Sequence, residues 1–507
     1  MKQTKFIKLA ESIGLGLLVA AAYMLPFRGV GLLESGLLVL FAVLIMRRSL
    51  DPAQKMAWLY LAMFIGVATA FYWMPGTIKA KGNLNWPTAG FAGLLFFAYE
   101  SFGIWLTWFA ARRAYLRTRS AWATAFAAGF ATLAWEFFAF HVYEWSWSAP
   151  LSGLPFLSRS GAFLGAYGIS ATLWAFAAYG MARRQDGATW SVSLRAPVLY
   201  IALLAGLSAA WYALPREPSR LIDVVMIQPN FVAGARWPGM DVDMEKEMWR
   251  LSDRALREGN LPKPERTTLL IWPESSVLGR DDRGSDARLQ MEAQRRGVAW
   301  LFGTEGGLLN LVRGEAPASP SFIQAKIYPM PFGERMPGPP WMRHWLDRVF
   351  GFYSQEPGVL SSKSSFTFPT PQGELKVHPL ICSEATMPLR SRDGLAVAGG
   401  QLLANLTNDG WFEHSPATNL HASEIRLRAV ELGIPMLRCT LTGKSGIARE
   451  NGESDLWGEP MTQGTYVFSL AWSPVRTPAR SPWLFRGLVA FFLAGTLILG
   501  IRRAEIP

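Results

Sequence analysis

Cysteine is scarce in this chain, because only Cys382 and Cys439 occur among 507 residues. Two thiols do not make the disulfide framework of a small secreted domain, and a bond between these two would consume a reactive thiol. The five histidines show no His-Glu-x-x-His spacing, so we predict no zinc site, and we expect no other metal or cofactor. A Gly-x-Ser-x-Gly motif is also missing, which excludes the serine hydrolases that depend on it.

Charged side chains are few as well, at 17% of the sequence, whereas half of the residues are hydrophobic and the mean hydropathy is +0.15. A soluble protein of this length is usually more polar. The formal net charge of +12 does not indicate nucleic acid, because many basic residues lie in short loops between apolar runs and form no stripe on a soluble module. The 22 tryptophans, several at the ends of apolar runs, are typical of membrane-interface anchors.

Long apolar runs are what the sequence has in abundance. Seven occupy the first 215 residues and an eighth lies near the C-terminal end, each close to the ~20 residues that cross the hydrocarbon core. They lie near 9–26, 29–46, 56–74, 88–111, 121–140, 161–182, 196–214 and 483–501. The first follows three lysines as a signal peptide would, but no small-residue cleavage site comes after it, so we expect an uncleaved anchor.

Lysine and arginine are distributed unevenly over the loops that join these runs. One alternate set of loops carries fifteen of them, namely Lys2, Lys5, Lys8, Arg47, Arg48, Lys55, Arg112, Arg113, Arg117, Arg119, Arg183, Arg184, Arg195, Arg502 and Arg503. The other set carries only Arg28, Lys79, Lys81 and Arg159. Because positive loops stay inside, we expect both termini in the cytoplasm. We therefore predict a seven-helix transmembrane domain over 1–215, an external domain over 216–481, and a C-terminal transmembrane helix within 482–507.

The external segment alternates between apolar strands and amphipathic helices, which predicts an α/β domain with helices covering a central sheet. We expect strands at 221–227, 267–272, 298–302, 375–381, 401–406 and 435–440, and helices at 244–258, 286–297 and 416–432. A further stretch, 341–352, has helical spacing with a wide apolar face. It is either a helix packed on the domain or an arm that dips into the membrane surface.

Three motifs of this domain carry candidate catalytic residues. Glu274 follows an apolar strand, Lys326 precedes the rigid segment Pro329-Met-Pro-Phe-Gly-Glu334, and Cys382 ends an apolar run with Glu384 two residues later. Taken singly, each has an ordinary interpretation as a strand-end carboxylate, a surface lysine or an inert buried thiol. Taken together, they provide a base, a cation and a nucleophile, because a thiol becomes reactive when a nearby cation or base activates it.

The three motifs in this order resemble the Glu–Lys–Cys triad of the nitrilase, or carbon–nitrogen hydrolase, superfamily, with Glu334 at the position of its second glutamate. Asn405-Leu-Thr-Asn-Asp-Gly-Trp-Phe412 and Arg426-x-Arg-Ala-x-Glu-Leu-Gly433 are similar to segments of that superfamily as well. With the eight apolar runs, and with Gln228-Pro-Asn230 and Trp237, the chain resembles the bacterial apolipoprotein N-acyltransferase family over nearly its whole length. It departs from that family at Ser383, where Tyr is usual, at Leu441, where Asn is common, and in the short stretch before Lys326.

The resemblance implies a fold, a reaction and a set of site residues. The fold is an α/β nitrilase-like αββα sandwich domain inserted in an eight-helix transmembrane bundle of the bacterial inner membrane. The reaction moves an acyl chain from a phospholipid, through a cysteine thioester, to the α-amino group of the diacylglyceryl-cysteine of an apolipoprotein. The implied catalytic residues are Glu274, Lys326, Cys382 and Glu334, and the implied substrate-binding residues are Trp237, Glu384, Trp411 and Phe412.

Two other functions fit the residues. A membrane-tethered amidase would use the same triad and let water attack the thioester. A polytopic membrane protein with a degenerate binding module would have no activity, and its function would survive the loss of Cys382. The occupied triad disfavours this second alternative, whereas the apolar stretch 341–352 and the number of apolar runs favour a lipid substrate over an amide.

Overall fold

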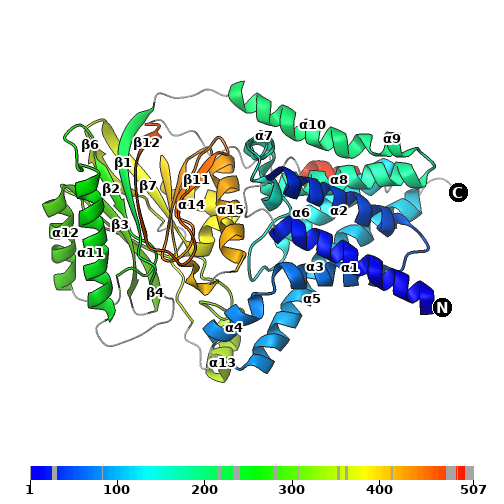
Figure 1. The fold of residues 1–507 in the computed structure, drawn as a ribbon, viewed down its shortest axis with the longest axis horizontal. Helices are drawn as coiled ribbons and strands as arrows, with labels where there is room; N and C mark the ends of the chain where they lie inside the picture. Colours follow the sequence, from blue (N-terminus) through cyan, green and yellow to red (C-terminus); the bar gives the residue numbers. More distant parts are fainter. Residues whose placement is uncertain are drawn as a thin grey trace.

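The structure is a computed structural model that describes residues 2–24, 31–82, 84–213, 219–231, 240–277, 283–306, 308–350, 354–359, 363–412, 415–474, 487 and 489–496. Figure 1 shows a helical part, built mainly from the first 213 residues, beside a part that contains two β-sheets. The chain therefore separates into the two kinds of structure that its hydropathy predicts.

The helical part contains one helix at each of the seven predicted N-terminal apolar runs. Its elements are α1 (Lys2–Met24), α2 (Gly31–Leu50), α3 (Met56–Ala70), α4 (Met74–Gly82), α5 (Trp86–Thr118), α6 (Ala121–Phe138), η1 (Ala149–Leu151), α7 (Pro155–Ser158), α8 (Gly161–Gln185), α9 (Trp190–Ser193), α10 (Arg195–Ala210) and η2 (Trp211–Ala213). Side-chain caps mark the start of two of these helices. Asn85 accepts a hydrogen bond from the Thr88 N–H at the start of α5, and Ser120 accepts one from the Ala123 N–H at the start of α6.

Within the described residues, three helices are long and apolar enough to cross a membrane, at 86–118, 161–185 and 190–213. The pair α3 and α4 makes a fourth if its 54° bend is counted as a broken span. The prediction of eight spans is thus supported in part, and the remaining spans stay predictions. The eighth run, 483–501, lies largely outside the described residues, although 489–496 are helical.

Each of the two sheets has six strands. The first has the order β12-β1-β2-β3-β4-β5 and the second the order β11-β10-β9-β8-β7-β6. In each sheet three adjacent strands are parallel, β1, β2 and β3 in the first and β7, β8 and β9 in the second, while the outer strands are antiparallel. The strands are β1 (Arg220–Gln228), β2 (Thr268–Ile271), β3 (Val298–Gly306), β4 (Leu309–Glu315), β5 (Phe322–Ala325), β6 (Phe366–Thr370), β7 (Gly373–Ile381), β8 (Leu402–Thr407), β9 (Met436–Thr440), β10 (Gly446–Ala448), β11 (Ser454–Leu456) and β12 (Gly464–Trp472).

Three apolar cores hold these sheets and their helices together. One core joins side chains of both sheets, such as Leu269 and Leu402, so the sheets face each other. A second joins the first sheet to α11 (Met240–Glu258) and α12 (Arg283–Arg296), and a third joins the second sheet to α14 (Pro388–Ala398) and α15 (Ala417–Leu432). Strands such as β2 are apolar throughout because both of their faces are buried.

Two helices lie where the sheet-containing part meets the helical part. Figure 1 shows α15 facing the helical part, and the two are joined by hydrogen bonds such as that from Ser146 Oγ to Glu424, 3.0 Å long. The predicted arm is α13 (Pro340–Phe350), which Figure 1 draws close to α4. Its Trp341, Trp345 and Val349 are 73%, 59% and 54% exposed, so this helix presents an apolar stripe outward.

Candidate active site

The predicted catalytic residues follow the ends of three strands. Glu274 comes after β2 and Lys326 after β5, both in the first sheet, and Cys382 comes after β7 of the second sheet. The facing of the two sheets brings these strand ends together. All three side chains are buried, with exposed fractions of 3%, 1% and 9%.

Charged groups and one amide connect this cluster. Lys326 Nζ lies 2.7 Å from the carboxylate of Glu334 and 3.6 Å from that of Glu274. Asn310 Nδ2 donates to both carboxylates, over 2.7 Å to Glu274 and 3.2 Å to Glu334. The backbone N–H of Asn408 donates to the other oxygen of Glu274 over 2.8 Å. Each carboxylate is therefore held in place by at least two partners, which fixes the position of the ammonium group between them.

Burial disfavours the charged state of all three residues, so it shifts the pKa of an acid upward and the pKa of a base downward. It raises the pKa of Glu274, and the charge of Lys326 opposes that rise. It also raises the pKa of the Cys382 thiol to about 12, with a further contribution from the charge of Glu274. For Lys326 burial acts to lower the pKa, but the charges of Glu334, Cys382 and Glu274 outweigh it and raise the pKa above its usual value. The thiol is therefore protonated at neutral pH, and the lysine beside it is a cation.

The backbone is strained at each of the three motifs. Ser275, Phe332 and Cys382 have φ values of 54°, 58° and 49°, a left-handed conformation that costs a residue other than glycine about 1 to 3 kcal/mol. Glu274 also depends on a close approach of two strands, because a Cβ at Gly303 would come within 2.5 Å of the Glu274 Cα. Strain of this kind persists only where the surrounding structure holds it, and it clusters at functional sites.

Two side chains hold the strained peptide of Cys382. Asn405 Nδ2 donates to the Cys382 carbonyl oxygen over 3.1 Å, and the ring Nε2 of His421, on α15, lies 3.4 Å from the same oxygen. Both belong to a buried network in which Asp409 contacts His421 at 3.1 Å and Arg438 at 2.5 Å. Arg438 also donates to Asn405 Oδ1 over 2.7 Å. The orientation of the thiol thus depends on a buried network of polar and charged side chains that bind one another.

Glu384 is 1% exposed, and backbone groups occupy its carboxylate. One oxygen accepts from the N–H groups of Ile327 and Tyr328, at 2.8 and 3.3 Å, and the other accepts from the N–H of Ile381 at 2.9 Å. Lys363 Nζ lies 3.5 Å from this second oxygen. Glu384 therefore joins the segment that carries Lys326 to the strand that carries Cys382.

A small cavity of about 20 Å³ adjoins Cys382. Phe412 and His421 line it together with Met330, and the helical part contributes Tyr143 and Glu144. The rings of Trp73 and Tyr143 pack edge-on against Phe412, with centroids 5.2 and 5.8 Å apart. Aromatic side chains of the helical part thus cover the thiol.

The remaining predicted site residues lie in different places. Trp411 packs against the core of the helical part, where its carbonyl oxygen accepts a hydrogen bond from Thr77 Oγ1 over 3.1 Å. Trp237 lies outside the described residues. Cys439 is fully buried, with its thiol 3.3 Å from the Ile227 carbonyl oxygen, and both cysteines are free. Ser383, one of the departures from the family pattern, lines the cavity beside the thiol.

Several residues of the site were not predicted. Asn310 lies on β4, whose sequence contains no motif, and it reaches the carboxylates only because β4 pairs with β3 and β5. His421 belongs to none of the sequence motifs, and its contact with Cys382 depends on how α15 packs. Tyr143 and Glu144 precede the thiol by more than 200 residues. The sequence did contain one sign of the network that holds the Cys382 peptide. The motif Asn405–Phe412 includes two of its members, Asn405 and Asp409.

The sequence is similar to known proteins. The carbon–nitrogen hydrolase family model matches residues 309–468, a range that includes Lys326, Glu334 and Cys382. A protein named apolipoprotein N-acyltransferase from Allorhizobium ampelinum is 30% identical over 326 residues, which are 59% of this chain and 57% of that protein. A protein of the same name from Rhizobium etli is 28% identical over 361 residues, 65% of this chain and 64% of that protein.

The chain spans less than two thirds of the length of these relatives. A solved structure, glutamine-dependent NAD+ synthetase from Acinetobacter baumannii in complex with ADP, is similar over 57% of this chain and 53% of that chain. Its TM-score is 0.34 at 13% sequence identity, and no inference rests on a likeness of that size. The sequence relatives and the family model agree with each other: the chain carries a carbon–nitrogen hydrolase domain and is a homologue of the proteins named apolipoprotein N-acyltransferase.

Proposed function

We propose that this protein is a membrane N-acyltransferase that moves an acyl chain from a phospholipid to the α-amino group of the diacylglyceryl-cysteine of an apolipoprotein. The observation that carries the proposal is the cover over the thiol. Cys382 lies beside a base and a cation, and it is shielded by Phe412 and by Tyr143 and Trp73, which lie in segments that connect helices of the helical part. A lipid that is held in the membrane reaches such a site more readily than a soluble amide does.

In the first half-reaction Glu274 takes the proton of the Cys382 thiol as the sulfur attacks the ester carbonyl carbon of the phospholipid. Because the pKa of the thiol is about 12, no thiolate accumulates in the resting enzyme, and proton transfer accompanies the attack. The tetrahedral intermediate then collapses, the ester C–O bond breaks, and the departing alkoxide receives the proton from Glu274. The products are a thioester on Cys382 and a lysophospholipid.

In the second half-reaction the α-amino group of the acceptor attacks the thioester. Glu274 takes a proton from the amine, an amide bond forms, and the C–S bond breaks. The proton returns to the sulfur, and the thiol is restored. Both halves develop negative charge on an acyl oxygen. Lys326 stabilises that charge, together with the first backbone N–H groups of η4 (Cys382–Thr386), which have no partner within their own short helix.

The other predicted residues have supporting parts in this scheme. Glu334 and Asn310 hold the ammonium of Lys326 and the carboxylate of Glu274 at the distances given above. Phe412 forms part of the apolar wall for the acyl chain, and Trp411 adjoins it in the chain. For Trp237 we propose a contact with the substrate. For Glu384 we propose a positioning role in place of direct substrate binding, because its carboxylate is already occupied by three backbone N–H groups.

We further propose that an αββα sandwich is inserted in an eight-helix bundle of the bacterial inner membrane, with residues 1–215 and 482–507 in the membrane and 216–481 outside. The distribution of basic residues over the loops supports this orientation. Donor and acceptor then lie in the same outer leaflet as the site, which makes their encounter two-dimensional. The exposed apolar stripe of α13 would rest on that leaflet.

A membrane-tethered amidase is the second candidate, and the match to the carbon–nitrogen hydrolase family favours it. It would use the same triad, with water as the second nucleophile. One incubation separates the two candidates. Purified protein receives a phospholipid with a labelled acyl chain and a diacylated lipopeptide, and the products are resolved by mass spectrometry. Label in a triacylated peptide supports the acyltransferase, whereas labelled free fatty acid without acylated peptide contradicts it.

A further inference from the structure

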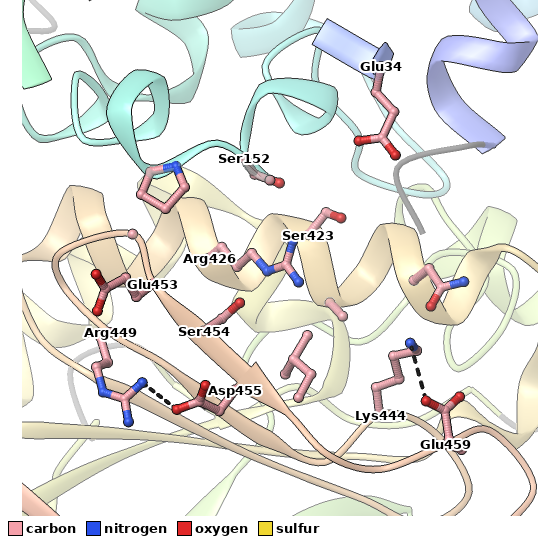
Figure 2. Close-up of a pocket in the computed structure, with 16 residues that line it drawn as sticks. Glu34, Ser152, Ser423, Arg426, Lys444, Arg449, Glu453, Ser454, Asp455 and Glu459 are labelled. Atoms are coloured by element: carbon pink, nitrogen blue, oxygen red, sulfur yellow. Dashed lines mark hydrogen bonds and ion pairs between the residues drawn. The ribbon is translucent and has the colours of Figure 1, made fainter. Parts of the chain in front are cut away.

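A second and much larger cavity lies on the opposite side of α15 from the thiol. Its volume is about 920 Å³, and it is bounded by α15, by the loops around β10 and β11, and by α2 and the 152–155 segment of the helical part. None of its lining residues lines the cavity at Cys382. In Figure 2 Glu34 and Ser152 face α15 from the helical part, and Arg426 lies on α15 opposite them.

Arg426 differs from the other cations of this cavity. Arg449 pairs with Asp455 at 2.6 Å, and Lys444 lies 4.0 Å from Glu459 (Figure 2). Arg426 makes no hydrogen bond or ion pair in the described part of the chain, and its Nε is shielded from solvent without a partner. Burial lowers the pKa of Arg426, and the charge of Glu34 acts in the opposite direction. Arg426 is half-buried, and its planar set of donors fits the oxygens of a phosphate or carboxylate.

Arg159 connects the lining of this cavity to two aromatic residues at the end of an apolar helix. Trp211 and Tyr212 follow the apolar helix α10, and Tyr212 is 56% exposed. The guanidinium of Arg159 lies over both rings, 5.7 and 4.8 Å from their centroids. The same guanidinium donates to the Asn451 carbonyl oxygen over 2.6 Å and lies 3.7 Å from Glu453, which lines the cavity. Tryptophan and tyrosine at the end of an apolar helix mark the level of lipid headgroups.

We propose that this cavity is a binding site for a zwitterionic phospholipid headgroup, with the phosphate on Arg426 and the ammonium among the carboxylates opposite. The inference rests on the proposed membrane placement of the protein. The lining contains Glu34, Glu453, Asp455 and Glu459, which is one carboxylate more than its cations, so a headgroup of net negative charge is disfavoured. Serine hydroxyls of residues 152, 423 and 454 add neutral hydrogen-bonding groups.

Lipid bound here is not a substrate, because α15 separates it from the thiol. It connects the two parts of the molecule instead. Arg426 and His421 lie on the same helix, and His421 contacts the Cys382 carbonyl oxygen on the other side. A headgroup that joins Arg426 to the helical part would hold α15, and with it the peptide of the nucleophile, in one position.

The test is calorimetric titration of the detergent-solubilised full-length protein with glycerophosphoethanolamine. This probe has the headgroup but no acyl ester, so it cannot acylate Cys382. Because Arg426 makes no contact that folding requires among the described residues, Arg426→Gln should fold normally, and its melting temperature checks this. The matched control is Arg295→Gln, since Arg295 is an exposed arginine on α12 far from the cavity lining.

We expect saturable binding that Arg426→Gln weakens at least tenfold and Arg295→Gln leaves unchanged. Unchanged binding in Arg426→Gln, or no binding to the wild-type protein, would overturn the proposal. Equal affinity for inorganic phosphate would overturn the zwitterionic assignment, and tighter binding of a lipid-free Gly-Lys-Glu-Ser peptide would assign the cavity to a polypeptide. Thioester formation on Cys382 in Arg426→Gln is measured separately, so a failure of the proposed acyl transfer is distinguished from a failure of this site.

Discussion

At the scale of single residues, the candidate site holds the thiol of its proposed nucleophile in the protonated form. Cys382 has a left-handed backbone and a thiol with a raised pKa, so it is protonated at rest. Glu274 is buried next to it with a raised pKa of its own, which makes the carboxylate a stronger base than one in water. Lys326 stays charged between two carboxylates and needs no rearrangement when an oxyanion forms.

The first prediction concerns Glu274 as the general base. Glu274→Gln should lower the rate of thioester formation by about 10² to 10⁴-fold, the usual contribution of a positioned base. In the wild-type protein this rate should fall as the pH drops through the raised pKa of Glu274, because only the deprotonated carboxylate accepts the proton. Single-turnover acylation with labelled phospholipid at several pH values measures both effects. The exposed Glu265→Gln is the matched control, and a rate for Glu274→Gln close to that of the control would contradict the assignment.

At the scale of elements, the ends of β7, β8 and β9 and the helix α15 are tied by the Asp409–His421–Arg438 network. Burial raises the pKa of Asp409, but Arg438 and His421 outweigh it and hold the pKa below its usual value. For His421 burial and the charge of Arg438 lower the pKa, against the opposing effect of Asp409. The histidine is therefore neutral in the folded protein at neutral pH.

A pH dependence of stability follows for the second prediction. Because the pKa of His421 is lower in the folded protein than in the unfolded chain, the unfolded chain binds more protons as the pH falls below 6.5. The contribution of His421 to the free energy of unfolding is therefore present above pH 6.5 and is lost below that value. We expect the melting temperature of the wild-type protein to fall between pH 7 and pH 5, and His421→Gln to flatten the fall. Scanning fluorimetry over this window measures it. Equal slopes in the two proteins would show that His421 does not titrate as described.

The third prediction concerns the apolar stripe of α13. Trp345→Glu replaces a side chain that is 59% exposed and should leave the melting temperature in detergent nearly unchanged. The same change should reduce acyl transfer from phospholipid in bilayers severalfold, because a charge on the membrane-facing stripe is repelled from lipid. His344→Glu, an exposed polar position on the same helix, is the control. A large loss of thermal stability in Trp345→Glu would instead favour a helix packed on the domain.

Much of the fold at this scale could be predicted from local patterns. The runs that become β2, β7, β8 and β9 are mainly apolar, and seven long apolar runs became helices. The antiparallel strands β4, β5, β6, β10, β11 and β12 were not predicted, because most of them are short and rich in polar residues. The pairing of β12 with β1 also joins segments that are far apart in the sequence. Glu274, Lys326 and Cys382 could be found because each ends an apolar run. Asn310, His421 and Tyr143 could not, since only tertiary packing brings them to the site.

At the scale of the whole molecule, the helical part and the sheets both contribute residues to the candidate site. The cover over Cys382 comes from the segment around Tyr143, and the cavity there, about 20 Å³, is too small for an acyl chain as it stands. Under the proposed function, entry of a lipid requires Tyr143 and Phe412 to separate. This coupling explains why a carbon–nitrogen hydrolase domain would be joined to so many apolar helices.

The fourth prediction concerns the orientation of the molecule in the membrane. Both native cysteines are buried, so a single introduced cysteine should account for the labelling by a maleimide. In intact spheroplasts, Arg295→Cys on the sheet-containing part should react with a membrane-impermeant maleimide. Asp186→Cys, in the basic loop after α8, should react only after lysis. Labelling of Asp186→Cys in intact cells, with none of Arg295→Cys, would reverse the proposed topology.

The central claim is that Cys382 carries the acyl group, and intact-protein mass spectrometry tests it most directly. Purified protein is incubated with a phospholipid of defined acyl chains and without acceptor, and its mass is recorded. We predict an increase equal to one acyl group that hydroxylamine removes, that is absent in Cys382→Ala, and that persists in Cys439→Ala because that thiol is core. An unchanged mass in the wild-type protein, or the same increase in Cys382→Ala, would contradict the account.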